Sequence, residues 1–291
     1  MRAVGLIAVT VFFALVLVAR VHGAPTFAFT TIDVPGAVLT NAQGINHQGD
    51  TVGTYTDSGG RQHGFLRSGG QFRTIDVPGA NVTFARGIND AGDIVGTYQR
   101  PGETGGIPQH GFLLTRRGGL QAVDYPGHLN TIPQRILNDG TILGCYHDND
   151  TMGSMHGMQF QRGFSGIDMS MSMNNGATPD GEYIVGLFTD MDGRGKAYVM
   201  DGSSFSRLEM PGALSTAGWD VNPSRFVVGV YTDTAGAVHG FGYDGRSFTR
   251  IDAPGAAVTR IFGINDRGDL VGNFVDAAGR THGLLAQVVS Q

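Results

Sequence analysis

Short apolar segments alternate with turns along most of the chain, and the pattern is clearest over residues 71–114. Four pieces recur there: a segment ending in Ile-Asp, then Gly-Ile-Asn-Asp, then Asp-Ile-Val-Gly-x-Tyr, and finally His-Gly-Phe-Leu. Each piece is apolar or alternating and is bounded by Pro, Gly or Asn-Asp, which is typical of a short strand followed by a tight turn. One copy of about 43 residues therefore predicts a four-stranded antiparallel sheet.

The copy occurs six times. Self-similarity at this period is typical of a propeller or a solenoid. A solenoid needs atypical polar ends, whereas the first and last copies here are among the most regular, so the pattern favours a propeller. The acidic residue that ends the outer segment of each copy is Asp33, Asp76, Asp124, Asp168, Glu209 or Asp252.

The two ends of the repeat region complement each other. An extra outer segment, residues 27–33, precedes the first copy, and the last copy ends at residues 282–289 without an outer segment of its own. Pairing of these segments would complete the sixth sheet and remove an exposed sheet edge. We therefore predict an all-β fold: a six-bladed β-propeller with four antiparallel strands per blade, closed by strand 27–33 against strand 282–289.

The first residues differ from the repeats. Arg2 precedes a long apolar run that ends at Ala19, and small residues follow. This arrangement is typical of a secretory signal peptide; the alternative is a membrane anchor, since the run is near the lower length of a span. We predict a signal peptide over residues 1–23, a propeller over 24–291, no membrane span after cleavage, and a secreted or periplasmic location.

Composition narrows the classes of function. The 47 glycines suit many tight turns between short strands. The single cysteine, Cys145, excludes an internal disulfide and lies in an apolar strand pattern, as a packed thiol would. A net charge of −5 without a basic run argues against a nucleic-acid partner. The single lysine, Lys196, argues against lysine-based covalent catalysis.

Residues that recur in every copy are interpreted as scaffold. One active site cannot use five equivalent positions around a ring, so the histidines of the His-Gly motif are expected to hydrogen-bond between strands or blades. The outer carboxylates and the Asp residues of the Asn-Asp-x-Gly turns are expected to serve the turns. The five histidines are His63, His110, His156, His239 and His282.

Functional residues are sought where the copies differ. The loops between the second and third strands are longer in copies two and three and fall on one predicted face. An inner-strand position three residues before the repeat Asn also varies, and there Arg could clamp a carboxylate and Trp could stack on a sugar. The alternative is packing between blades. Together with histidines on the same face, the predicted ligand contacts are Arg86, Arg135, Trp219, His128 and His147.

A segment rich in Met, His and Asp suggests a metal site. Thioether and imidazole donors favour copper, particularly Cu(I), and the segment resembles the Met-rich segments of exported copper-handling proteins. The Asp oxygens alternatively suit Ca²⁺, although a full calcium loop has more ligands. Adaptable packing by Met is the competing interpretation. The predicted metal ligands, for copper or calcium, are His147, Asp148, Asp150, Met152 and Met155.

Three motifs resemble the HAF family of probable extracellular repeats in bacterial proteins. They are Gly-Ile-Asn-Asp-Ala-Gly-Asp-Ile-Val-Gly-Thr-Tyr (87–98), His-Gly-Phe-Leu (63–66 and 110–113) and Thr-Ile-Asp-Val-Pro-Gly-Ala (31–37 and 74–80). The resemblance spans almost all of the chain after the signal peptide, with the fourth copy degenerate. It implies export and a repeat fold, and it supplies no catalytic residues.

No reaction motif of the nucleophile-elbow, zincin or P-loop type occurs in the sequence. The leading hypothesis is therefore a secreted or periplasmic binding module that recognises an extracellular small molecule, carbohydrate or protein on one face. The rival is a hydrolase or lyase acting on a polysaccharide or small extracellular substrate, with His147 or His128 as base. The third hypothesis is metal handling through residues 147–173.

Overall fold

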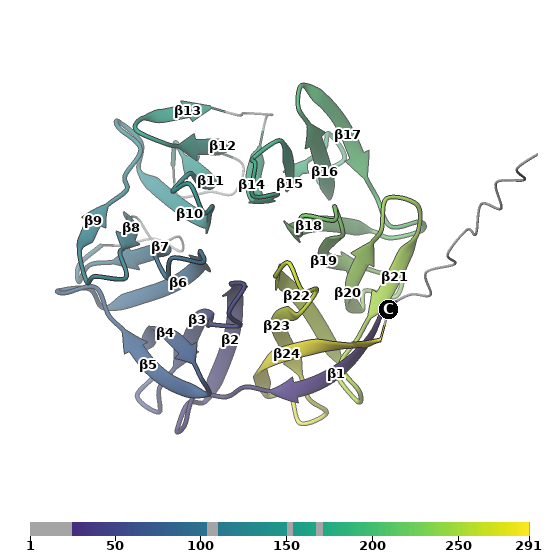
Figure 1. Cartoon of the computed structure of the whole chain (residues 1–291), viewed down its shortest axis with the longest axis horizontal. Helices are drawn as coiled ribbons and strands as arrows, with labels where there is room; N and C mark the ends of the chain where they lie inside the picture. Colours follow the sequence, from purple (N-terminus) through teal and green to yellow (C-terminus); the bar gives the residue numbers. More distant parts are fainter. Residues whose placement is uncertain (1–24, 104–109, 150–153, 167–170, 291) are drawn as a thin grey trace, which may run out of the picture.

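Six four-stranded sheets are arranged radially about a central axis (Figure 1). A single parallel contact, between Gln62 and Val82, joins the first two sheets, while the strands within each sheet pair antiparallel. The predicted all-β, six-bladed propeller is confirmed. The computed structural model describes residues 25–103, 110–149, 154–166 and 171–290.

Each blade runs from an inner strand at the axis to an outer strand at the rim. The first three blades contain β2 (Leu39–Ile45), β3 (Thr51–Thr56), β4 (Gln62–Ser68) and β5 (Gln71–Ile75); β6 (Val82–Ile88), β7 (Ile94–Gln99), β8 (His110–Leu114) and β9 (Leu120–Ala122); and β10 (Asn130–Ile136), β11 (Ile142–His147), β12 (Met155–Phe160) and β13 (Phe164–Gly166). The last three contain β14 (Ser172–Ala177), β15 (Tyr183–Thr189), β16 (Gly195–Asp201) and β17 (Ser204–Leu208); β18 (Ser215–Val221), β19 (Val227–Thr232), β20 (Val238–Tyr243) and β21 (Phe248–Ile251); and β22 (Val258–Ile264), β23 (Leu270–Val275), β24 (Thr281–Ser290) and β1 (Thr26–Thr31).

The tight turn after each inner strand follows from its sequence. In the first blade the Asn46 amide N–H donates to the Asp50 carbonyl at 3.1 Å, and the Asn46 side-chain oxygen accepts the Asp50 N–H at 2.9 Å. Gly49 lies between them with φ +86°, a conformation that only glycine adopts readily. The Asn-x-x-Gly spacing therefore sets where β2 ends and β3 begins.

The ring is closed between the two ends of the described chain, as predicted. β1 pairs antiparallel with β24, with Phe27 opposite Val288 and Phe29 opposite Ala286, so that the first strand completes the last blade (Figure 1). Beyond β1, the Ile32 N–H donates to the Gly283 carbonyl at 2.9 Å. β1 therefore covers the edge of β24 that would otherwise be exposed.

Four of the five recurrent histidines each bridge two carboxylates within a blade. His63 Nδ1 lies 2.9 Å from Asp76, at the end of β5, and its Nε2 lies 3.2 Å from Asp57, in the loop before β4. The ring also stacks on Tyr55, with centroids 5.0 Å apart. The hydrogen bonds expected of these residues are therefore present. Equivalent pairs of carboxylates flank His110 (Asp124, Glu103), His239 (Asp252, Asp233) and His282 (Asp33, Asp276).

The hydrophobic core is divided among the contacts between neighbouring blades. Val52 of the first blade clusters with Ala85, Ile94 and Phe112 of the second, and each of these side chains is almost fully buried. Because every sheet is covered on both faces by its neighbours, residues on both faces of the strands are apolar. This arrangement holds the inner strands at fixed positions around the axis.

Candidate functional site

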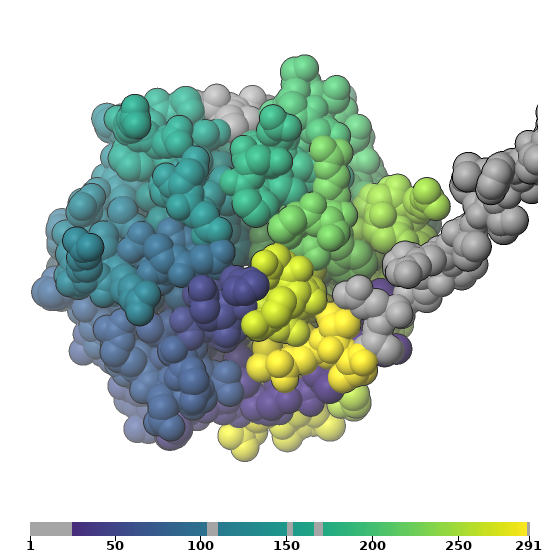
Figure 2. All heavy atoms as spheres, in the orientation of Figure 1, coloured from purple at the N-terminus to yellow at the C-terminus, as the bar shows by residue number. Residues whose placement is uncertain are grey.

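A cavity of about 150 Å³ opens on the axis where the six inner strands end in their tight turns. Figure 2 shows atoms of the first blade (purple) and the sixth blade (yellow) meeting near the middle of this face. Aliphatic residues at the ends of the inner strands line the cavity, and turn residues, four of them polar and two of them prolines, form its mouth. The aliphatic residues are Ile45, Ile88, Ile136, Ala177, Val221 and Ile264; the mouth residues are His47, Asp90, Asn138, Pro179, Pro223 and Asp266.

The asparagines of the turns tie neighbouring blades together below this mouth. Asn265 Nδ2 donates to the Asn46 carbonyl at 3.1 Å, Asn46 Nδ2 to the Asn89 carbonyl at 3.2 Å, and Asn89 Nδ2 to the Leu137 carbonyl at 3.3 Å. Each bond crosses from one blade to the next. These hydrogen bonds therefore fix the turns of the sixth, first, second and third blades relative to one another below the mouth.

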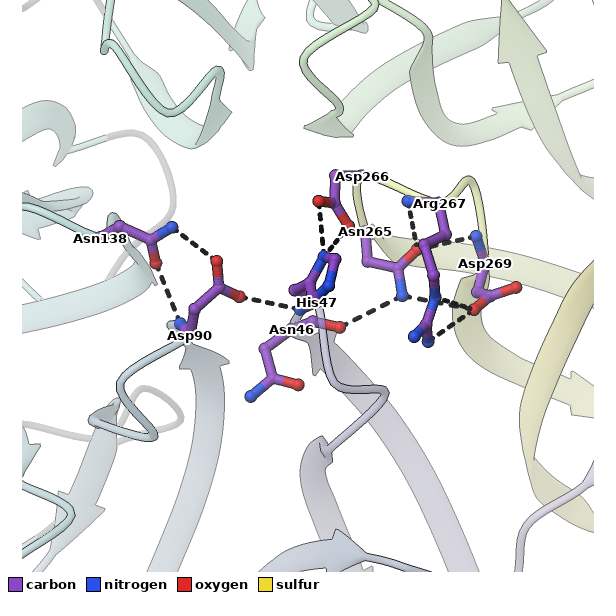
Figure 3. A network of polar contacts seen from close by, with 8 residues as sticks. All are labelled: Asn46, His47, Asp90, Asn138, Asn265, Asp266, Arg267 and Asp269. Atoms are coloured by element: carbon purple, nitrogen blue, oxygen red, sulfur yellow. Dashed lines mark hydrogen bonds and ion pairs between the residues drawn. The ribbon is translucent and has the colours of Figure 1, made fainter.

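Side chains from four blades form a hydrogen-bonded chain at the mouth (Figure 3). His47 Nδ1 lies 2.7 Å from a carboxylate oxygen of Asp266, and the His47 N–H donates to Asp90 at 2.8 Å. Asp90 in turn accepts a hydrogen bond from Asn138 Nδ2 at 2.6 Å and donates its own N–H to Asn138 Oδ1 at 2.9 Å. Among the described residues, His47 Nε2 has no hydrogen-bond partner, so this nitrogen is available to a ligand.

An ion pair crosses the axis below the mouth. Arg135 of β10 pairs with Asp220 of β18, with side chains only 8% and 4% exposed, and both line the cavity. Asp220 also accepts the Ile264 N–H at 2.9 Å. Burial raises the pKa of Asp220 to about 6, opposed by the charge of Arg135. Within the described chain, Arg135 Nε has no hydrogen-bond acceptor.

This pair occupies a position that is glycine in the other four blades. Every inner strand carries a one-residue bulge, and the residue that follows the bulge is Gly44, Gly87, Arg135, Gly176, Asp220 or Gly263. The inner strands approach one another closely here: a Cβ at Gly44 would lie 2.7 Å from the Arg86 carbonyl oxygen, and one at Gly176 would lie 2.5 Å from Asp220 Oδ1. Glycine in the fourth blade thus leaves the space that the ion pair between the third and fifth blades fills.

The bulge residues form a second layer on the axis beside the ion pair. They are Gln43, Arg86, Gln134, Asn175, Trp219 and Phe262. The expected equivalence of Arg135 with Arg86 is therefore wrong by one residue, because Leu137 rather than Asn138 opens the turn in the third blade: the Leu137 N–H donates to the Thr141 carbonyl at 2.8 Å, as the N–H of the repeat Asn does elsewhere.

Arg86 carries a charge that nothing nearby balances. In the described part of the chain its hydrogen-bond acceptors are all neutral oxygens, those of Gln134 at 3.3 Å, Thr97 at 3.4 Å and Gln43 at 3.5 Å, and its guanidinium lies 5.5 Å from the centroid of the Phe84 ring. Burial lowers the pKa of Arg86 to about 10, so the guanidinium remains charged at neutral pH. A partly buried cation without a carboxylate partner is unfavourable and would be stabilised by a bound anion.

The predicted ligand contacts lie in two places. Arg86, Arg135 and Trp219 are at the axis, and Trp219 contacts Phe262 edge-on at 4.8 Å between ring centroids. His128 instead lies in the third blade, with Nδ1 2.8 Å from Asp148. His147 is fully buried, and its Nε2 lies 3.6 Å from Cys145 Sγ. The five residues do not form one cluster, and their role as ligand contacts or bases stays a prediction.

The predicted metal ligands are also divided. Asp148 accepts hydrogen bonds from His128 and from His156, which lower its pKa, whereas His147 and Met155 are buried on β11 and β12. Asp150 and Met152 lie outside the described residues. Over the described ranges, no three His, Cys, Asp or Glu side chains form a group that could hold a metal ion. Copper or calcium binding by the predicted set stays a prediction.

Sequence reasoning missed the residues at the mouth. His47, Asp90 and Asp266 directly follow the repeat Asn, and the repeated Asn-Asp-x-Gly pattern was interpreted as turn chemistry alone. The available signal was variation between copies, since this position changes to Asn138, Pro179 and Pro223 in the other blades. A position that varies while its neighbours repeat can indicate a functional residue in a turn as well as in a strand.

Comparisons with known proteins reach the fold only. No family model and no curated protein matches the sequence. The structure is similar to a gluconolactonase from Xanthomonas campestris (TM-score 0.56, 13% identity, 90% of each chain) and to the fucose-binding lectin of Aleuria aurantia, a six-bladed propeller (TM-score 0.52, 12% identity, 88% of this chain and 93% of the lectin). It is also similar to TolB from Acinetobacter baumannii (TM-score 0.57, 14% identity), of which it spans 63%.

The similar structures share the propeller architecture at low sequence identity, which establishes the fold of this chain and leaves its ligand open. The described residues contain no helix of the length and apolar character that a membrane crossing requires. By architecture, the chain belongs with the six-bladed β-propellers.

Proposed function

We propose that this protein is an exported propeller that binds a small neutral saccharide in the axial cavity between its turns. The observation that supports the proposal is the arrangement of polar atoms around a confined space, two of which, Arg135 Nε and His47 Nε2, have no hydrogen-bond partner among the described residues. Arg135 lies at the floor, and His47 Nε2 and the Asp90 and Asp266 carboxylates lie at the mouth. Export rests on the predicted signal peptide.

The chemistry of a sugar fits these groups. Hydroxyls can donate to the carboxylates and accept from the guanidinium and the Asn138 amide, and the aliphatic wall can cover the apolar face of the ring. Two carboxylates at the mouth disfavour an anionic ligand there through like-charge repulsion. The propeller lectins that this chain resembles in fold recognise fucose, so neutral monosaccharides are the first ligands to test.

The single tryptophan offers a direct measurement. Trp219 precedes Asp220 at the cavity floor, so saccharide binding should change its fluorescence, and titration of the mature protein gives the affinity. Asp90→Asn should weaken binding roughly 10-fold or more, because a hydrogen bond to a charged group is worth about 1.5–3 kcal/mol. The asparagine oxygen can still accept the His47 N–H, while the hydrogen bond from Asn138 Nδ2 is lost, because the asparagine NH2 group is a donor.

Asp192→Asn is the matched control, since Asp192 lies in an exposed loop between β15 and β16 and accepts only the Arg194 N–H among the described contacts. It should bind like the unaltered protein. Equal losses in Asp90→Asn and Asp192→Asn would contradict the proposal, as would the absence of binding to any neutral saccharide in a broad panel.

A second candidate function is the binding of an acidic saccharide by the layer that contains Arg86. The supporting observation is that, among the described residues, Arg86 contacts only neutral groups, in the same axial layer as a Trp219–Phe262 pair that could stack on a sugar ring. Uronic acids in the same titration should then lose about 10-fold or more in affinity on Arg86→Met and nothing on the exposed Arg246→Met. An affinity for uronic acids that is unchanged by Arg86→Met would rule this site out.

A further inference from the structure

A set of soft donor atoms is buried between the third and fourth blades. Cys145 and His147 are two residues apart on β11 and so point to the same face of the sheet, with Sγ and Nε2 3.6 Å apart. His147 is directly opposite Met155 on β12. Cys145 and Met155 belong to one core cluster with Met173 of β14, which comes from the next blade. Two sulfur ligand types and an imidazole are thus brought together from three strands.

An unsatisfied polar side chain lies beside this set. Asn130 is directly opposite His147 on the other neighbouring strand, β10, and therefore projects from the same face. It is 0% exposed, and neither its amide nitrogen nor its amide oxygen has a hydrogen-bond partner in the described chain. Buried amides are nearly always hydrogen-bonded, so this side chain indicates that a further group, such as an ion with its water or counterion, belongs here.

The nature of the donors selects the metal. Thiolate, thioether and imidazole ligands together favour Cu(I), whereas structural Zn²⁺ sites use Cys, His and carboxylates. Four donors lie in one buried region, and only two of them are His or Cys. The remaining two are thioethers, which are poor ligands for hard cations such as Ca²⁺.

We propose that Cys145, His147, Met155 and Met173 form a buried Cu(I) site between the third and fourth blades. Binding forms a copper–sulfur bond to Cys145 and releases the thiol proton to solvent, without electron transfer. Two of these residues, His147 and Met155, were in the predicted metal set; Cys145 and Met173 replace the carboxylate Asp148, which is engaged by His128 and His156. The site lies outside the axial cavity and does not depend on the saccharide ligand, and Gln134 of the axial layer donates a hydrogen bond to Met173 Sδ at 3.0 Å.

The test is an anaerobic titration of the reduced mature protein with Cu(I) in competition with a chromophoric Cu(I) chelator. One equivalent should bind per chain. Met155→Leu and Met173→Leu preserve volume and should each weaken Cu(I) binding at least ~10-fold, since even outer groups around a metal contribute that much. Cys145→Ser should remove the thiolate-to-copper absorption band.

Two methionines provide controls. Met158→Leu alters a fully buried methionine on the same strand that lies outside the cluster, and Met191→Leu alters a fully exposed one; neither should change the affinity. Thermal unfolding of each metal-free variant separates loss of ligand from loss of fold. Stoichiometric Cu(I) binding that survives Met155→Leu and Met173→Leu unchanged would overturn the proposal, as would failure of the unaltered protein to compete with the chelator.

Discussion

Asp220→Ala should lower the free energy of unfolding by about 3–5 kcal/mol, the cost of leaving one partner of a buried ion pair uncompensated. The substitution leaves the Arg135 guanidinium buried at the axis without its carboxylate. It also removes the acceptor of the Ile264 N–H, which lies on the neighbouring sixth blade. Urea denaturation at neutral pH, followed by circular dichroism, measures the effect.

The repeat itself supplies the control for this experiment. Glycine occupies the equivalent position in four blades, so Arg135→Gly with Asp220→Gly restores the common residue in the other two. The double variant removes both charges. Its loss of unfolding free energy should be smaller than the summed losses of the two single glycine variants, by a coupling energy of about 0.5–3 kcal/mol. Additivity of the single effects would show that the two side chains do not stabilise each other.

Much of the fold could be predicted because its determinants are local and repeated. The Asn-x-x-Gly spacing sets the turn after β2, and five histidines at one position indicate a shared hydrogen bond rather than five catalytic sites. Even the closure could be predicted, since an unpaired outer strand at residues 27–33 and a missing one after 282–289 have one simple solution. Each of these features needs only the order of residues along the chain.

The site could not be predicted to the same degree, because its contacts cross the axis. Arg135 and Asp220 occupy equivalent positions of the repeat two blades apart, and the repeat alone does not show that these two side chains meet across the axis. The third blade opens its turn at Leu137, so an alignment on Asn138 shifts Arg135 by one residue and assigns it to the wrong layer. On a strand, one residue exchanges the two faces, and this single shift was enough to conceal the ion pair.

A variant that begins at Val34, and so lacks β1, should unfold at least ~10 °C below a reference that begins at Pro25. Burial of Phe27, Phe29 and Ile32 against the sixth blade and its neighbour contributes on the order of 5 kcal/mol, and each kcal/mol shifts the midpoint by about 2–4 °C in a domain of this size. The exposed edge of β24 should also promote concentration-dependent self-association, which size-exclusion chromatography detects.

Adding the missing strand as a separate peptide tests whether the loss of β1 pairing lowers the unfolding midpoint. A peptide of residues 25–38 should restore the unfolding midpoint of the shortened chain, because it can pair with β24 as β1 does. The same peptide with Phe27→Ser and Phe29→Ser should not. Restoration by both peptides, or an unchanged midpoint in the shortened chain, would show that pairing of β1 with β24 does not hold the ring closed.

The stability that the closure of the ring contributes should depend on pH, and Asp33→Asn should remove this dependence. His282 Nδ1 lies 2.6 Å from Asp33, and this hydrogen bond, with a second that His282 donates to Asp276, raises the pKa of His282 above its usual 6.5. Because the pKa of His282 is higher in the folded state than in the unfolded state, protonated His282 stabilises the fold. This contribution is complete at pH values below the unfolded-state pKa and is lost as the pH rises through the folded-state pKa. The stability deficit of Asp33→Asn should therefore be largest in mildly acidic buffer and shrink as His282 loses its proton. A deficit that grows with pH would mean that the charged pair does not strengthen the seam.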